Sequence, residues 1–248
     1  MLIAIPSKGR ARRITSHRLL GDAAGDAVIF CPAAEVAAYR RHTPEVPVVG
    51  VPDHVTGITR TRNWILDWAR ARGERWVVQI DDDAIRWTYF EADFPAPGIP
   101  VPDDRKRDLL INMFEMAEDL GTNLWGFQVS YDPKFYREYS PFSLTSVVVG
   151  NLMGIIEDGQ RFDERLPLKE DYDFSLQSLY RHRRVLRCNK YAWGVQHHDT
   201  PGGCKTYRSF QAEREAIRIL QRKWGPNIVR LHPKKPYEIR VRVPIPGI

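Results

Sequence analysis

The sequence predicts an α/β fold with a mostly parallel central sheet, and three observations support this prediction. Short apolar runs alternate with amphipathic segments through the first 80 residues. The runs are apolar at consecutive positions, as in strands that are buried on both faces. Each run is stopped by a proline or by acidic residues, so the expected strands are short. Strands and helices that alternate in this way form right-handed crossovers around a parallel sheet.

The first four strands are expected at residues 2–5, 27–30, 46–51 and 76–80. A helix over residues 61–72 gathers its apolar side chains on one face and ends at Gly73. In parallel sheets, ligands bind where the strands reach their carboxyl ends. We therefore expect a ligand site built from residues 6–10, 31–32, 52–53 and 81–83.

The second half of the chain continues this pattern. A proline-rich segment at residues 94–104 is expected to form a loop. The later elements are a helix over 109–120, strands at 124–129 and 146–156, and helices over 172–180 and 210–224. With 248 residues and no internal repeat, the chain suits one α/β domain with a short appendage at most.

The composition excludes several classes of protein. Hydrophobic residues make up 43% of the chain and charged residues 27%, which is typical of a folded globular protein. Three widely spaced cysteines without a Cys-x-x-Cys pair disfavour a zinc ribbon and a disulfide framework. No apolar run is long enough for a signal peptide or a membrane span. These observations favour a cytoplasmic protein.

The formal net charge of +6 is unevenly distributed. The segment from Pro201 to the end holds 11 Lys and Arg against 3 Asp and Glu, whereas the preceding residues hold 26 against 28. Within this segment Arg214, Arg218 and Arg222 are spaced four apart and share one helix face. Such a face can follow a nucleic-acid backbone, and the alternative is a solvated basic tail.

The strongest chemical signal is the run Gln79-Ile80-Asp81-Asp82-Asp83 at the end of an apolar strand. In an extended segment Asp81 and Asp83 point the same way. Two such carboxylates can hold a divalent cation, with phosphate oxygens completing its ligands. The alternative is a solvated acidic turn, but the position at the carboxyl end of a buried strand favours the metal site.

Two basic segments can bind an anion. In residues 6–10, Gly9 allows close approach of the backbone, and Lys8 and Arg10 suit phosphate. Residues 59–63 open a helix with two arginines, and a helix N-terminus beside arginine is an anion site. Taken alone, each is explained as well by a solvated basic turn or an ordinary helix cap.

Two later segments add titratable groups. Residues 169–173 open a helix with acidic side chains, which the helix dipole favours and which a general base requires. His197 and His198 precede a Pro-Gly-Gly loop, and imidazole is a common metal ligand. A lone histidine is more often a hydrogen-bonded core residue, but a pair in a chain with a candidate metal site favours ligation.

The order of these motifs resembles that of the GT-A glycosyltransferases, which use nucleotide-sugar donors. The segments IPSKGRA, QIDDDA, KEDYDFSLQSLYR and QHHDTPGG look like those of the phage TET-associated glycosyltransferases, a group related to the base J glucosyltransferases. That family glycosylates 5-hydroxymethylpyrimidines in DNA, notably 5-hydroxymethylcytosine made by TET-type dioxygenases. The resemblance implies a GT-A catalytic domain over residues 1–203. We interpret residues 204–248 as a basic helical extension that packs on this domain and contacts DNA.

The resemblance also implies a role for each matching residue. The nucleotide sugar is expected to contact Pro6, Ser7, Lys8, Arg10, Arg60, Arg62, Asn63, Asp81 and Asp82. A Mn²⁺ or Mg²⁺ ion is expected on Asp83 and Asp81, completed by His197 or His198. Asp171 would be the general base of an inverting transfer, with Glu170 orienting a sugar hydroxyl. The residues expected to contact DNA are Lys205, Arg208, Arg214, Arg218 and Arg222.

The expected activity is therefore transfer of a sugar from a UDP-sugar to the hydroxymethyl group of 5-hydroxymethylcytosine or 5-hydroxymethyluracil in DNA. Candidates for stacking on the acceptor base are Trp87, Tyr131, Tyr136 and Trp193. The implied setting is the host cytoplasm of a phage, in functional association with a TET-type dioxygenase. The alternatives are a GT-A enzyme with a non-DNA acceptor, a metal-dependent nuclease and a non-catalytic reader of modified DNA. The sequence leaves the sugar open.

Overall fold

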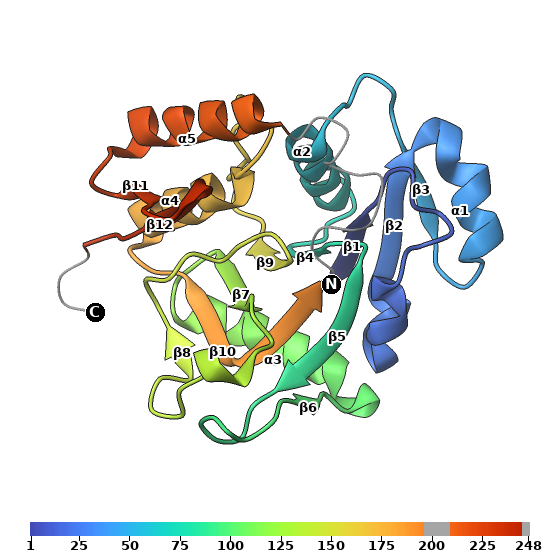
Figure 1. The fold of residues 1–248 in the computed structure, drawn as a ribbon. Coiled ribbons are helices and arrows are strands. Elements are labelled where there is room, and N and C mark those ends of the chain that lie inside the picture. The colour runs from blue at the N-terminus through green and yellow to red at the C-terminus, as the bar shows by residue number, and fades with distance from the viewer. Residues whose placement is uncertain (196–208, 245–248) are drawn as a thin grey trace.

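The computed structural model of the chain describes residues 1–195 and 209–244, and its core is a mixed sheet of ten strands (Figure 1). The strands are β1 (Leu2–Pro6), β2 (Ala27–Pro32), β3 (Val48–Val51), β4 (Trp76–Ile80), β5 (Ala84–Tyr89), β6 (Ile99–Pro100), β7 (Leu124–Gln128), β8 (Phe142–Ser143), β9 (Leu152–Ile156) and β10 (Leu186–Val195). Their order is β3-β2-β1-β4-β9-β7-β10-β5-β6, with β8 paired to β10. The main helices are α1 (Val36–His42), α2 (Ile58–Arg70), α3 (Lys106–Asp119), α4 (Glu170–His182) and α5 (Phe210–Trp224).

Strands β1 to β4 pair in parallel, and β7 pairs in parallel with β10. Strand β9 runs antiparallel to both β4 and β7, so these two halves of the sheet point in the same direction. The predicted α/β class with a mostly parallel central sheet is confirmed. The carboxyl ends of β1, β4 and β7 consequently lie at one edge, next to the start of β9.

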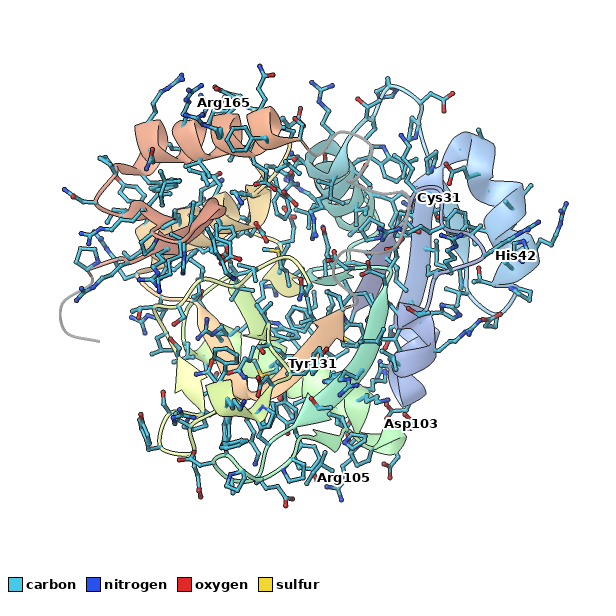
Figure 2. All side chains as sticks on the ribbon, viewed as in Figure 1. Cys31, His42, Asp103, Arg105, Tyr131 and Arg165 are labelled. Carbon is cyan, nitrogen blue, oxygen red and sulfur yellow. The ribbon has the colours of Figure 1, made fainter. Side chains whose placement is uncertain are left out.

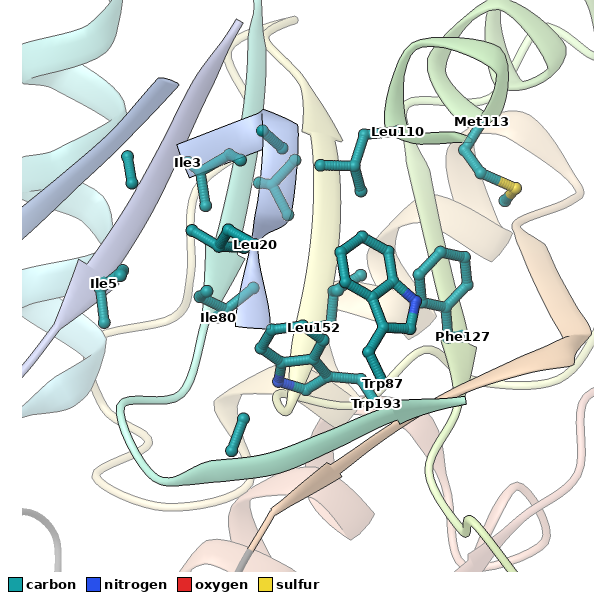
Figure 3. Packing of buried hydrophobic residues seen from close by; sticks show 14 of the residues in the cluster. Ile3, Ile5, Leu20, Ile80, Trp87, Leu110, Met113, Phe127, Leu152 and Trp193 are labelled. Atoms are coloured by element: carbon teal, nitrogen blue, oxygen red, sulfur yellow. The ribbon is translucent and has the colours of Figure 1, made fainter. Parts of the chain in front are cut away.

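Each face of the sheet is covered by its own hydrophobic cluster. Successive residues of β1 point to opposite faces of the sheet. Ile3 and Ile5 belong to the first cluster, and Leu2 and Ala4 belong to the second. The first cluster packs under α1 and α3, and Trp87 meets Trp193 edge to face within it at a ring separation of 5.3 Å (Figure 3). The second packs under α2, α4 and α5. Burial on both faces is the physical reason why the strands are apolar at consecutive positions.

The C-terminal segment contains more than a helix. After α5 the chain forms a hairpin of β11 (Val229–His232) and β12 (Lys235–Val241), so the prediction of a purely helical extension is incomplete. Ile217 and Leu220 of α5 share their cluster with Phe174 of α4, beside which α5 lies in Figure 1.

Polar contacts fasten both ends of α5 to the start of α4. Lys223 and Trp224 bind the two carboxylate oxygens of the fully buried Asp173, at 2.9 and 2.7 Å. Lys169 Nζ lies 2.8 Å from Glu213 Oε2. None of the helices in the described residues is long and apolar enough to cross a membrane.

Candidate active site

The three aspartates after β4 form a tight turn at the edge where the parallel strands end. Thr15 and Ser16 hold this turn in place: Thr15 N–H donates to the Asp82 carbonyl at 3.0 Å, and Ser16 Oγ donates to the Asp81 carbonyl at 2.5 Å. The Asp81 N–H donates to the carbonyl of Asn151, just before β9, at 3.1 Å. The backbone of the turn is therefore fixed on both sides, which gives the carboxylates defined positions.

Arg10, from the basic segment after β1, binds two of these carboxylates. Its Nη1 lies 2.5 Å from Asp82 Oδ1 and 3.3 Å from Asp83 Oδ2. Ser7 Oγ donates a short hydrogen bond to the other oxygen of Asp82 and also contacts the hydroxyl of buried Tyr39 at 2.6 Å. The basic segment at residues 6–10 and the Asp81–Asp83 turn are therefore in contact. Asp82 makes most of the contacts between them.

Arg62, from the first half of α2, is the second cation of the site and is 2% exposed. Its guanidinium lies 3.3 Å from Asp81 Oδ1 and 3.3 Å from Glu170 Oε1. It also donates to Gln79 Oε1 at 3.3 Å and to the Gly150 carbonyl at 3.2 Å. One buried side chain therefore connects α2, β4, the segment before β9 and the first turn of α4.

Asp171 is positioned by a glycine. Its Oδ2 accepts the Gly150 N–H at 2.7 Å. A Cβ at Gly150 would lie 3.0 Å from Arg62 Nη2 and 3.2 Å from Asp171 Oδ2, so a larger residue would push these two groups apart. The absence of a side chain at residue 150 therefore allows the carboxylate and the guanidinium to approach the same stretch of backbone.

Among the residues that the structure describes, acidic side chains outnumber basic ones at this site. Two guanidinium groups, from Arg10 and Arg62, lie among the acidic side chains of Asp81, Asp82, Asp83, Glu170 and Asp171. Burial raises the pKa of Asp81 to about 7, with Arg62 opposing the shift and the neighbouring carboxylates adding to it. A bound cation would relieve this repulsion, and carboxylate oxygens are ligands that Mg²⁺ and Mn²⁺ accept.

The metal site stays a prediction. Within residues 1–195 and 209–244, no three His, Cys, Asp or Glu side chains are grouped so as to hold a metal ion. His197 and His198 lie outside the described residues, as do Lys205 and Arg208 of the expected DNA contacts.

Asn63 and Arg60, both expected near the nucleotide sugar, contact the segment before α4. Asn63 binds the backbone of Phe162 through both amide atoms, at 2.8 and 3.0 Å, and so connects α2 to the segment before α4. Arg60 is half-exposed and forms an ion pair with Glu164 at 3.3 Å. Lys8 is exposed next to Gly9. Pro6 is buried as the last residue of β1.

The three arginines of α5 share an exposed face, as predicted. Arg218 and Arg222 each lie near Glu215, at 3.4 and 3.6 Å, and Arg214 lies over the ring of Phe210. One acidic side chain, Glu215, therefore lies within this basic face.

Several residues of the site are missed by sequence reasoning. Tyr39, Ser16 and Gly150 each contact a predicted site residue and belong to no chemical motif. Gln79 contacts Arg62 and opens the acidic run, but no role is predicted for it. Gln79 alone carried a signal, since a glutamine within an apolar strand needs a buried polar partner.

Comparisons with known proteins match most of the chain to one family. A family profile described as TET-Associated Glycosyltransferase matches residues 1–203. None of the curated proteins matches the chain. Among solved structures, a protein assigned as a nucleotide-diphospho-sugar transferase from Desulfovibrio desulfuricans is similar at 12% identity and a TM-score of 0.42, covering 79% of this chain and 81% of that one. A mannose-1-phosphate geranyltransferase from Thermus thermophilus is similar at 11% identity and a TM-score of 0.36, covering 91% and 61%.

Proposed function

Because the chain belongs to the TET-associated glycosyltransferase family over residues 1–203, we propose that it transfers a sugar from a UDP-sugar to the hydroxymethyl group of 5-hydroxymethylcytosine or 5-hydroxymethyluracil in DNA. It is a glycosyltransferase, and its GT-A assignment follows from the family. The observation that best supports a catalytic site is the meeting of the Asp81–Asp83 turn with Glu170 and Asp171 around Arg62.

Mn²⁺ or Mg²⁺ would be held by Asp83 and Asp81, together with His197 or His198. The donor chemistry fits, because two carboxylates follow one strand and the turn has an excess of negative charge. When bound, the ion would neutralise the departing diphosphate. Arg10 anchors Asp82 and contacts Asp83, so it would keep both carboxylates oriented toward the donor.

Asp171 would act as the general base. A primary alcohol is a weak nucleophile until a base accepts its proton, and Asp171 is held in place by the Gly150 N–H. As the proton moves to this carboxylate, the acceptor oxygen would form a bond to the anomeric carbon while the bond to the diphosphate breaks. Attack from the opposite face would invert the anomeric centre. Glu170, fixed by Arg62, would orient a sugar hydroxyl.

The acceptor is proposed to be DNA, because the basic face of α5 suits a phosphate backbone. The direct test incubates the protein with Mn²⁺, UDP-sugars and DNA that contains 5-hydroxymethylcytosine, 5-hydroxymethyluracil or only ordinary bases. Mass spectrometry of the digested nucleosides should show a sugar increment on a hydroxymethylated base alone. Release of UDP without any increment would refute the DNA acceptor, and nicked DNA would indicate a nuclease.

Two variants separate the proposed roles. Asp83→Ala should abolish metal-dependent binding of the donor in calorimetry, whereas Asp171→Asn should retain it and lose transfer. Equal loss of donor affinity in both variants would contradict the roles of metal ligand and general base.

The DNA face needs its own variant. Reversal of Arg214, Arg218 and Arg222 to Glu should weaken DNA binding and leave hydrolysis of the donor unchanged. Unchanged affinity for DNA would exclude this face.

A further inference from the structure

A pocket of about 720 Å³ lies beside β5, the strand that follows the aspartate turn. It is lined by Arg86 and Thr88 of β5, by Gly98 before β6, by the segment after β7, and by Val195 at the end of β10. This volume is within the range of small-molecule sites. None of the catalytic or donor-binding residues named above lines it.

The pocket adjoins the proposed catalytic centre through the sheet. Strand β5 begins at Ala84, directly after Asp83, and Ala84 pairs with Val195. The register shifts between Gly194 and Val195, which marks a bulge, and Arg86 pairs with Gly194 beyond it. Bulges beside active sites re-aim side chains. The side chain of Arg86 is thereby brought to the pocket a short way along the strand from the aspartates.

The pocket contains one stacked pair of planar groups. The Arg86 guanidinium carbon lies 4.5 Å from the centre of the Tyr131 ring. A Cβ at Gly194 would approach that ring to 2.5 Å, so the missing side chain makes room for it. Tyr131, labelled in Figure 2 in front of β10, is 39% exposed.

Of the four aromatic residues proposed to stack on the acceptor base, only Tyr131 has a side chain exposed enough to contact it. Trp87, Tyr136 and Trp193 are each at most 3% exposed. Aromatic rings and guanidinium planes are the groups on which proteins stack bases that have left the helix.

Asp132 gives the pocket a chemical preference. It is the one acidic side chain among the described residues that line the pocket. Its Oδ1 accepts the Lys134 N–H at 3.0 Å, which orients the carboxylate. A carboxylate repels phosphate but accepts a hydrogen bond from the exocyclic amino group of cytosine. Uracil presents a carbonyl oxygen at that position, which a carboxylate disfavours.

The two loops that contribute residues to the pocket also carry exposed aromatic side chains. Phe94, Phe135 and Tyr139 are 52%, 66% and 84% exposed on the two loops beside it. Lys134 Nζ lies 5.6 Å from the Phe94 ring, which brings these loops together. Exposed aromatic rings interleaved with basic residues are typical of surfaces that bind unpaired nucleic acid.

We propose that this pocket receives the acceptor base after it has been turned out of the duplex, that Tyr131 and Arg86 stack on the base, and that Asp132 selects cytosine over uracil. The inference rests on the proposed function and specifies its acceptor as 5-hydroxymethylcytosine. Extrusion is part of the proposal because enzymes that act on a base within duplex DNA bring that base out of the stack.

The test uses photo-cross-linking and needs no sugar donor. Duplexes carrying 5-iododeoxycytidine or 5-iododeoxyuridine at one position are bound to the full chain and irradiated, and the attached peptide is identified by mass spectrometry. The iodine occupies the position of the hydroxymethyl group. We expect attachment in the peptide that contains Tyr131, with a higher yield for the cytosine derivative.

Variants make the test specific. Tyr131→Ala should lower the yield about tenfold or more, because base–aromatic stacking is lost, whereas Tyr131→Phe should keep it. Asp132→Asn should lower the preference for cytosine about tenfold. Tyr180→Ala, which removes a 69% exposed tyrosine from α4, should change neither the yield nor the preference.

The outcomes separate this inference from the proposed function. Sugar transfer by the wild-type protein, with cross-links in another peptide or none at all, would overturn the pocket and keep the transferase. Cross-links at Tyr131 without transfer to any hydroxymethylated DNA would keep the base pocket and overturn the proposed function. A cytosine preference that is unaltered in Asp132→Asn would overturn the assigned selectivity.

Discussion

Replacing Arg62 by methionine tests whether one buried guanidinium holds the site together. Methionine is long and apolar, so it would fill part of the space without leaving a charge. Glu170, itself 6% exposed, would then lose Arg62 as a partner, and Asp81 would lose it as well. Breaking a buried ion pair by removing one partner costs roughly 3–5 kcal/mol. We expect the free energy of unfolding of Arg62→Met to fall by about this amount.

The same helix provides the control. Arg60 lies two residues away, is 52% exposed at its side chain, and pairs with the exposed Glu164 at a similar distance. Arg60→Met should cost less than about 1 kcal/mol, since exposed ion pairs contribute little. Both variants can be measured by urea denaturation followed by tryptophan fluorescence. Adding Glu170→Gln to Arg62→Met should restore part of the loss, because the buried carboxylate is then neutral. A cost for Arg62→Met as small as that for Arg60→Met would refute the reasoning.

Two further predictions concern a glycine and an acidic residue. Gly150→Ala places a methyl group between Arg62 and Asp171. It should lower kcat about tenfold, while the donor affinity measured by calorimetry changes less than about twofold. An unchanged kcat would show that Asp171 needs no such positioning. The hydrogen bonds from Arg165 hold the pKa of Asp163 well below its usual range, and Lys223 assists. A lowered pKa contributes stability above the unfolded value of about 4, and this contribution is lost as the pH falls toward the folded value. Asp163→Asn should therefore destabilise the protein at pH 7 and progressively less below about pH 4 in denaturation curves; an equal cost at both pH values would disprove the linkage.

Features that depend on local pattern are the ones that the sequence predicts well. Aspartates after a buried strand and basic residues after another meet at one sheet edge, because parallel strands end together. The meeting of the Asp81–Asp83 turn with Arg10 follows from this rule alone. So does the exposed face of α5, because its arginines recur with the helix period.

The pattern fails where distant segments decide the structure. Residues 146–151 are apolar enough to suggest a strand, but β9 begins only at Leu152. Ser175 of α4 binds both backbone groups of Val148, so this stretch follows the helix and leaves the sheet. Asn63 looks like a ligand residue beside two arginines, yet its amide is used by Phe162, 99 residues away. Strands β5 and β10 are not predicted, because their aromatic and polar residues mix without a clear period.

The attachment of α5 to α4 means that the boundary of the family is not a boundary of the folded unit. The family match ends at residue 203, but the cluster under α4 is completed by Ile217, Leu220 and Ile239 from beyond it. Asp173 likewise meets its two side-chain partners only there. A relative that stops near that boundary must cover the outer face of this helix with residues of its own. In this chain, a substitution in the buried face of α4 therefore also changes the surface on which α5 and β12 pack.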